Sequence, residues 1–236
     1  MLDDVVIING IFSLIFVVVC IIVGLLIFSQ YFKLRDRNLL LVGIAWMGLS
    51  EPWLPSSISF LVALVNGKGL TLEVYIFLGN FFLPLTLMAW LIAMTDLLVI
   101  EKKKTILIAC GIFVIFFEIF MIYYILTDPS FLGELVSPVD IDYTIYAIVL
   151  LFANLLIFFI TGFLFVIKSI QSEIPKIRLK GKLLLVAFIC FLIGTALDLI
   201  ATTPLFRLIL VLSAIIFYMG YILPKPITKL FLKKED

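Results

Sequence analysis

Histidine is absent from this 236-residue chain, and charged residues make up only 14% of it. The lack of histidine excludes histidine-ligated haem, histidine zinc sites and histidine proton relays. A retinal-binding lysine is also missing from the interior of the last apolar run, where Lys225 comes only at the end. The chain has no phosphate-binding glycine loop, nucleophile elbow or HExxH motif. We therefore expect no cofactor, no metal ion and no enzyme activity.

Cysteine is rare, and its three copies are Cys20, Cys110 and Cys190. All three fall inside apolar runs, which indicates small packing residues and not disulfides or ligands. Hydrophobic residues reach 64% of the chain, with a mean hydropathy of +1.31. Soluble domains contain about 45–50% apolar and about 25% charged residues. The composition therefore predicts an integral membrane protein.

The apolar residues form seven runs, each long enough to cross about 30 Å of hydrocarbon as a helix. We predict an all-α bundle of seven transmembrane helices in a single domain, followed by a short basic tail at 224–236. The predicted spans are 5–32, 38–65, 71–99, 105–127, 142–167, 183–202 and 205–223.

The basic residues are distributed unevenly among the breaks between these runs. Lysine and arginine number 3 in the first break, 3 in the third, 5 in the fifth and 4 in the tail, which is 15 of the 17 in the chain. Lys68 and Arg207 lie on the other side. Cytoplasmic loops carry the excess of lysine and arginine. The pattern predicts a multi-pass protein of the cell membrane with its N-terminus outside and its C-terminus inside.

The second run contains the sequence GLSEPWLPSSISF, in which Glu51 stands beside Pro52 and Pro55. Counted at 1.5 Å per residue, Glu51 lies near the midplane, where a charged side chain is costly and favours the bundle interior or a wet cavity. The prolines remove backbone donors and predict a kinked or broken helix. We interpret Glu51 as a marker of a polar cavity, with structural hydrogen bonding between helices as the alternative.

We assign other polar residues to the same candidate ligand-binding region because several of them also fall near the midplane. A structural role remains open for each of them. They are Ser56, Ser57, Asn80, Thr86, Glu118 and Asn154.

Asp198 and Arg207 flank a short break between the last two runs, in the sequence ATTP. Opposite charges on either side of such a turn can pair, which removes most of the cost of placing either one there. We expect a structural ion pair at the outer face.

Three stretches, YIFLGNFFLPLTLMAWLIAMTD, EKKKTILIACGIFVIFF and YYILTDPSFLG, resemble the seven-helix N-terminal sensor region of some prokaryotic histidine kinases and related signalling proteins. The resemblance covers roughly residues 38–135. It implies an acidic residue in the second span and a proline in the middle of the third, which Glu51 and Pro84 match. Since the chain has no histidine to phosphorylate, the resemblance implies a separate signalling partner.

Three functions stay open. The first is a stand-alone membrane sensor that binds an unknown ligand in a polar cavity and signals to a cytoplasmic protein. The second is a small-solute or ion transporter or channel with a midplane site at the broken second helix. The third is a membrane subunit of a larger complex. The expected surroundings are the lipid bilayer, and the net charge of +1 does not suggest a nucleic acid.

Overall fold

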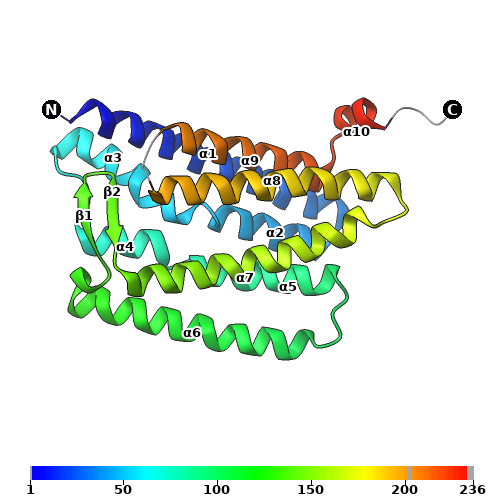
Figure 1. Cartoon of the computed structure of the whole chain (residues 1–236), viewed down its shortest axis with the longest axis horizontal. Helices are drawn as coiled ribbons and strands as arrows, with labels where there is room; N and C mark the ends of the chain where they lie inside the picture. Colours follow the sequence, from blue (N-terminus) through cyan, green and yellow to red (C-terminus); the bar gives the residue numbers. More distant parts are fainter. Residues whose placement is uncertain (1, 201–203, 233–236) are drawn as a thin grey trace.

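The computed structural model describes residues 2–200 and 204–232. Within them the chain is almost entirely helical, and the long helices run roughly side by side between two ends of the molecule (Figure 1). The helices are α1 (Asp4–Leu34), α2 (Arg37–Gly48), α3 (Leu54–Asn66), α4 (Leu72–Asn80), α5 (Leu83–Leu97), α6 (Lys103–Thr127), α7 (Ile145–Ile170), α8 (Pro175–Ile200), α9 (Pro204–Ile222) and α10 (Lys225–Phe231). Two 3-10 turns, η1 (Glu51–Trp53) and η2 (Pro129–Phe131), and two strands, β1 (Gly133–Ser137) and β2 (Asp140–Tyr143), complete the described elements.

Five helical stretches are long and apolar enough to cross a membrane, and a bent pair made of α9 and α10 raises the number to six. The five are α1, the stretch Leu72–Leu97 that contains α4 and α5, α6, α7 and α8 up to Asp198. Their outer faces carry many exposed large apolar side chains, including Ile112, Ile115 and Ile119 on α6. Apolar surface on this scale suits contact with lipid. These features fit a helical membrane protein.

The predicted helix boundaries agree closely with α1, α6, α7 and α9. The sixth helix differs, because α8 begins at Pro175 and not at residue 183. Its first turns, PKIRLKGK, are charged but contain good helix formers, so the helix extends beyond the apolar run. The predicted end of this helix at residue 202 lies outside the described residues.

The second predicted helix is broken, as its prolines indicated. It consists of α2, the turn η1 and α3. The third, predicted as one helix over 71–99, is also interrupted, because α4 ends at Asn80 and α5 begins at Leu83. Pro84 explains this break, since it lacks an N–H and its ring collides with the carbonyl four residues earlier, at Asn80.

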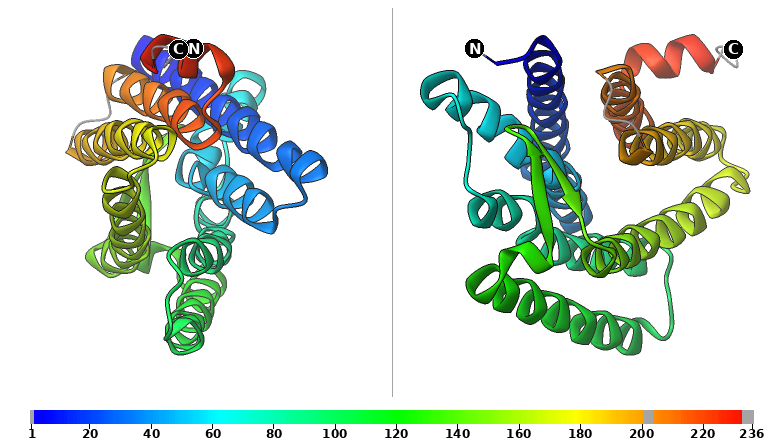
Figure 2. Two further views of the ribbon diagram at one scale, coloured as in Figure 1. Left: turned by 90° about the vertical axis from the view of Figure 1, so that its right-hand side faces the viewer. Right: turned by 60° about the vertical axis from the view of Figure 1, so that its left-hand side comes forward.

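A small antiparallel hairpin follows α6, where the sequence had indicated only a break. Gly133 of β1 pairs with Tyr143 of β2, and the register shifts between Leu135 and Ser137. Figure 2 shows the hairpin reaching from the end of α6 towards α3. It is fastened there by hydrogen bonds from Ser59 to the Pro138 carbonyl and from the Tyr75 hydroxyl to the Val139 carbonyl, the second at 3.0 Å. The hairpin therefore joins α6 and α7 to the half-helices on the opposite side.

The core between the helices is strongly aromatic. Trp46 of α2 stacks on Phe217 of α9 with ring centroids 3.6 Å apart, and Trp90 of α5 stacks on Phe158 of α7 at 4.3 Å. Such pairs add to the gain from apolar burial. They tie α2 to α9 and α5 to α7, and so hold both broken helices within the bundle.

Candidate functional site

The two helix breaks meet at Glu51, which lies in η1 and is only 4% exposed. Its Oε1 accepts a hydrogen bond from the main-chain N–H of Phe82, at 2.6 Å. Phe82 immediately precedes α5, so its N–H belongs to the group of donors that a helix start leaves without an intrahelical partner. Glu51 therefore caps the second half of one broken helix from the break in another.

The second carboxyl oxygen of Glu51 has a different environment. Oε2 is buried and has no hydrogen-bond partner among the described residues. The residue borders a pocket of about 220 Å³ lined by Val17, Ile21, Met47, Gly48, Ser50, Glu51, Leu54 and Phe82. A buried polar atom left unpaired costs about 1–3 kcal/mol. Glu51 thus carries an unused acceptor atom and borders the pocket.

The walls of this pocket differ from the polar cavity that the sequence suggested. Apart from Ser50 and Glu51, its lining side chains are apolar. Ile21 and Phe82 are also exposed at the outer surface, at 38% and 49%. The site is therefore a mainly apolar pocket at the side of the bundle with a carboxyl group in its wall.

The breaks approach each other closely because small residues stand where they cross. A Cβ added to Gly48 at the end of α2 would lie 2.2–2.4 Å from the side-chain atoms of Thr86 on α5. A Cβ on Gly79 of α4 would come within 3.0 Å of the Pro55 ring on α3. Any larger residue at position 48 would push the two half-helices apart.

Glu118 is half-buried on α6, a helix with few buried residues. Both of its carboxyl oxygens are shielded and have no hydrogen-bond partner among the described residues. Glu118 does not line the pocket that Glu51 borders. Its carboxyl group is therefore a second one with unused acceptor atoms, on a different helix from Glu51.

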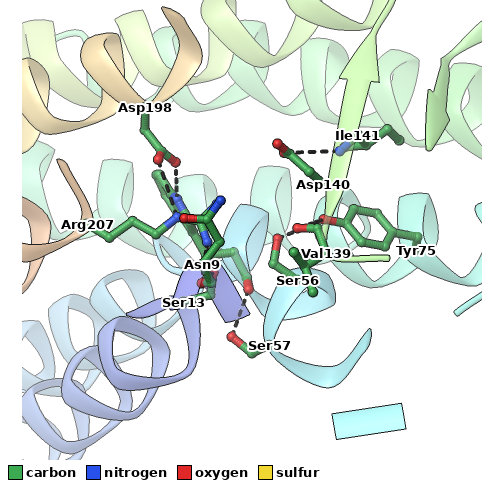
Figure 3. Close-up of polar contacts among 11 residues, drawn as sticks. Asn9, Ser13, Ser56, Ser57, Tyr75, Val139, Asp140, Ile141, Asp198 and Arg207 are labelled. Atoms are coloured by element: carbon green, nitrogen blue, oxygen red, sulfur yellow. Dashed lines mark hydrogen bonds and ion pairs between the residues drawn. The ribbon is translucent and has the colours of Figure 1, made fainter. Parts of the chain in front are cut away.

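Ser56 and Ser57 do not line the Glu51 pocket. The Ser56 hydroxyl is 2.7 Å from the hydroxyl of Tyr75, which contacts the hairpin through Val139 (Figure 3). Ser57 donates to the Trp53 carbonyl in the preceding turn, at 3.0 Å. Both serines therefore support the packing of α3, and Ser56 belongs to the attachment of the hairpin.

Asn80, Thr86 and Asn154 are also separate from that pocket. The side-chain amide of Asn80 donates to the Ile76 carbonyl at 2.7 Å and to the Tyr143 hydroxyl at 3.0 Å. Burial raises the pKa of Tyr143 to about 12, so its hydroxyl remains protonated at neutral pH. Thr86 donates to the Leu83 carbonyl within α5, and Asn154 is buried on α7. Of the predicted ligand-binding set, only Glu51 borders the pocket.

Asp198 and Arg207 form an ion pair, with Nε and Oδ1 3.3 Å apart (Figure 3). The pair is buried, since Arg207 is only 1% exposed. The guanidinium also donates to the Asn9 carbonyl at 2.5 Å and to the Ser13 hydroxyl. Trp53 donates its indole N–H to Asp198 Oδ2 at 2.8 Å. The network thus connects α1, η1, α8 and α9, beyond the simple pair at a turn that we expected.

Several residues of these contacts were missed from the sequence. Asn9 and Ser13 stand four residues apart in an otherwise apolar run, and this spacing on one helix face was a usable signal. The sequence contains no comparable signal for Trp53 and Phe82, because their hydrogen bonds are made with residues far away in the chain.

Comparison of the chain with family models, with curated proteins and with solved structures finds no match in any of the three.

Proposed function

We propose that the chain crosses the cell membrane seven times, with α2, η1 and α3 together as the second span and α4 and α5 as the third. The remaining spans are α1, α6, α7, α8 and α9. Support comes from the arrangement of the connections, because those after α1, α5 and α7 lie at the same end of the molecule as α10 (Figure 1). These are the lysine-rich and arginine-rich segments, which favour a cytoplasmic position for this end.

This topology predicts the outcome of reporter fusions. Reporters placed after Glu101 and at the C-terminus should both be active as cytoplasmic fusions, and one placed after Lys68 should be active outside. The physical reason is the basic-residue bias, since only Lys68 and Arg207 belong to the outer side. An outside signal at either of the first two positions would overturn the proposed orientation.

We further propose that the protein is a membrane sensor whose ligand enters the Glu51 pocket from the bilayer. The observation that carries this proposal is that Glu51 borders a mainly apolar pocket while its buried Oε2 has no hydrogen-bond partner among the described residues. An amphiphile with an amine or hydroxyl group could place its apolar part against Val17, Ile21 and Leu54. Its donor group would then satisfy the free oxygen.

Signalling follows from the double role of the Glu51 carboxyl. A donor that binds Oε2 would pull on the same carboxyl group whose Oε1 caps α5 through Phe82. A shift in that contact would alter the seating of α5, which ends at Leu97 near the basic end. A ligand changes a conformational equilibrium only through such differential contacts. The signal would reach a separate cytoplasmic protein at that end.

A transporter is the second candidate, favoured by the presence of two broken helices that face each other. Transporters use discontinuous helices to form substrate sites near the midplane. Flux of a radiolabelled short-chain amine into proteoliposomes distinguishes the two functions. Saturable, Glu51-dependent uptake would favour transport, whereas binding without uptake would favour a sensor.

The sensor proposal predicts a selective effect of Glu51→Gln. The amide has the same size and its oxygen can still accept from Phe82, so the protein should fold with nearly unchanged thermal stability. Dodecylamine should raise the thermal midpoint of the detergent-solubilised wild type, and this shift should be lost in Glu51→Gln. Glu73→Gln, at an exposed glutamate in the first turn of α4, is the control and should retain the shift.

Dodecanoic acid provides the matched ligand control, because its carboxylate brings no amine donor to Oε2. Equal shifts with the amine and the acid, or an equal amine shift in wild type and Glu51→Gln, would rule out recognition by Glu51.

A further inference from the structure

A second pocket lies at the basic end of the molecule, far from Glu51 in the chain. It has a volume of about 350 Å³ and opens between the start of α8, the end of α9 and α10. Its volume is in the range of small-molecule sites, about 300–1,000 Å³. The lining residues are Lys176, Lys180, Ile222, Leu223, Lys225, Thr228 and Lys229.

The lysines of this pocket come in two pairs. Lys176 and Lys180 are four residues apart on α8, and Lys225 and Lys229 are four residues apart on α10. Residues at this spacing share one face of a helix. Two helices thus each contribute a pair of ammonium groups to one concave site.

Among the residues that the structure describes, no acidic one lines the pocket. The ion pairs found within residues 2–200 and 204–232 are Lys103–Asp96 and Arg207–Asp198, so none of the four lysines is neutralised there. Lys180 is held in place by a hydrogen bond from its Nζ to the Tyr221 carbonyl, at 2.8 Å. This contact uses one of its three donors and leaves the others free. Like charges gathered in this way repel one another unless an anion lies between them.

The position of α10 indicates the depth of the pocket relative to the membrane. α10 is bent by 86° from α9, so it runs across the end of the bundle. Leu230 and Phe231 on it are exposed, at 73% and 57%. A short helix with lysines and exposed apolar residues, set across the ends of spanning helices, suits the boundary between headgroups and acyl chains. The pocket then lies at the level of the lipid phosphates.

We propose that the pocket between α8 and α10 is a binding site for a phosphate group, supplied by an anionic lipid of the adjoining leaflet. Basic pockets between helices on the cytoplasmic side bind anionic headgroups such as cardiolipin. The four lysines provide the charge, and Thr228 adds a hydroxyl in the same wall. Ile222 and Leu223 provide apolar contact for the glycerol region. Lipid bound here would fix α10 against α8.

The test compares two double variants of the full chain in detergent. Lys225→Gln/Lys229→Gln removes two exposed lysines from the pocket, and Lys102→Gln/Lys104→Gln removes two exposed lysines from the start of α6, at the same end of the molecule. Cardiolipin, phosphatidylcholine and inorganic phosphate are titrated separately. Thermal midpoint and lipid retention in native mass spectrometry are measured.

We expect cardiolipin to stabilise the wild type and phosphatidylcholine to have little effect. The apparent cardiolipin affinity should fall about ten-fold or more in Lys225→Gln/Lys229→Gln and change little in Lys102→Gln/Lys104→Gln, because only the first pair lines the pocket. If inorganic phosphate gives the same stabilisation with the same dependence on Lys225 and Lys229, the phosphate site stands and its source is soluble. The proposal would be overturned by an equal loss of cardiolipin affinity in both double variants. It would also be overturned if neither cardiolipin nor inorganic phosphate changed the thermal midpoint of the wild type.

Discussion

Replacing Arg207 with methionine should lower the thermal midpoint of the detergent-solubilised protein by about 10 °C. The guanidinium is only 1% exposed and donates to Asp198, to the Asn9 carbonyl and to Ser13. Arg207→Met leaves Asp198 without its cation and removes the guanidinium donor from the Asn9 carbonyl and the Ser13 hydroxyl, although the Asn9 carbonyl still accepts from Ser13. Removing one partner of a buried pair costs about 3–5 kcal/mol, and for a chain of this length each kcal/mol corresponds to about 2–4 °C.

The partly exposed ion pair between Lys103 and Asp96 provides the matched control. Its side chains are 34% and 32% exposed, so solvent screens their charges. Exposed pairs contribute about 0–1 kcal/mol. Lys103→Met should therefore leave the thermal midpoint almost unchanged. A comparable loss of thermal midpoint in Arg207→Met and Lys103→Met would show that burial of the ion pair does not determine its contribution to stability.

A double variant separates pairing from general loss of packing. Asp198→Asn/Arg207→Met removes both charges, and the asparagine carbonyl can still accept from the Trp53 indole N–H. The double variant should be more stable than Arg207→Met alone, because the unpaired carboxylate is gone. Strictly additive losses from Asp198→Asn and Arg207→Met would contradict coupling between the two side chains.

The features that could be predicted from the sequence are those set by local chemistry. Pro52 and Pro55 removed backbone donors beside Glu51, and the helix is interrupted there, at η1. Asp198 and Arg207 are nine residues apart across a short connection, so their contact required only a turn. In each of these cases the relevant residues are near neighbours in the chain.

Pro84 is a local sequence signal for the break between α4 and α5, but the prediction of one helix over 71–99 did not use it. Pro84 has the same effect on a helix as Pro52, yet its surroundings, LGNFFLPLTL, are apolar enough to be read as one continuous helix. The hairpin after α6 was missed for another reason. Its strands are only five and four residues long, and they are fastened by Ser59 and Tyr75 from other elements.

The candidate site depends mainly on contacts that no local pattern contains. Glu51 and Phe82 are separated by 31 residues, and Trp53 and Asp198 by 145. Polarity and depth grouped Ser56, Asn80 and Glu51 together, but side-chain direction separates them in the folded chain. The depth of a polar residue in a membrane helix can therefore be estimated from sequence, whereas the face it occupies depends on how the helices pack.

Gly48→Ala is expected to have the second large effect on stability. Its new methyl group would lie 2.2–2.4 Å from Cγ2, Oγ1 and Cβ of Thr86, and Cβ cannot move without the α5 backbone. Overpacking of this kind costs about 1–3 kcal/mol. The variant should lose several degrees of thermal midpoint. It should also lose the amine response, because Gly48 and Glu51 border the same pocket.

Gly111→Ala on α6 is the control for the intrinsic effect of replacing a helical glycine. A Cβ at that position would meet no atom within 4 Å. Because alanine is a better helix former than glycine by about 1 kcal/mol, the thermal midpoint of this variant should equal that of the wild type or lie slightly above it. Gly48→Ala/Thr86→Ser provides the complementary test, since it removes one of the clashing atoms and should recover part of the loss. If Gly48→Ala and Gly111→Ala instead had the same thermal midpoint, α2 and α5 would be packed less closely than the contact of Gly48 with Thr86 indicates. This packing would then not be what holds the Glu51 carboxyl next to the Phe82 N–H.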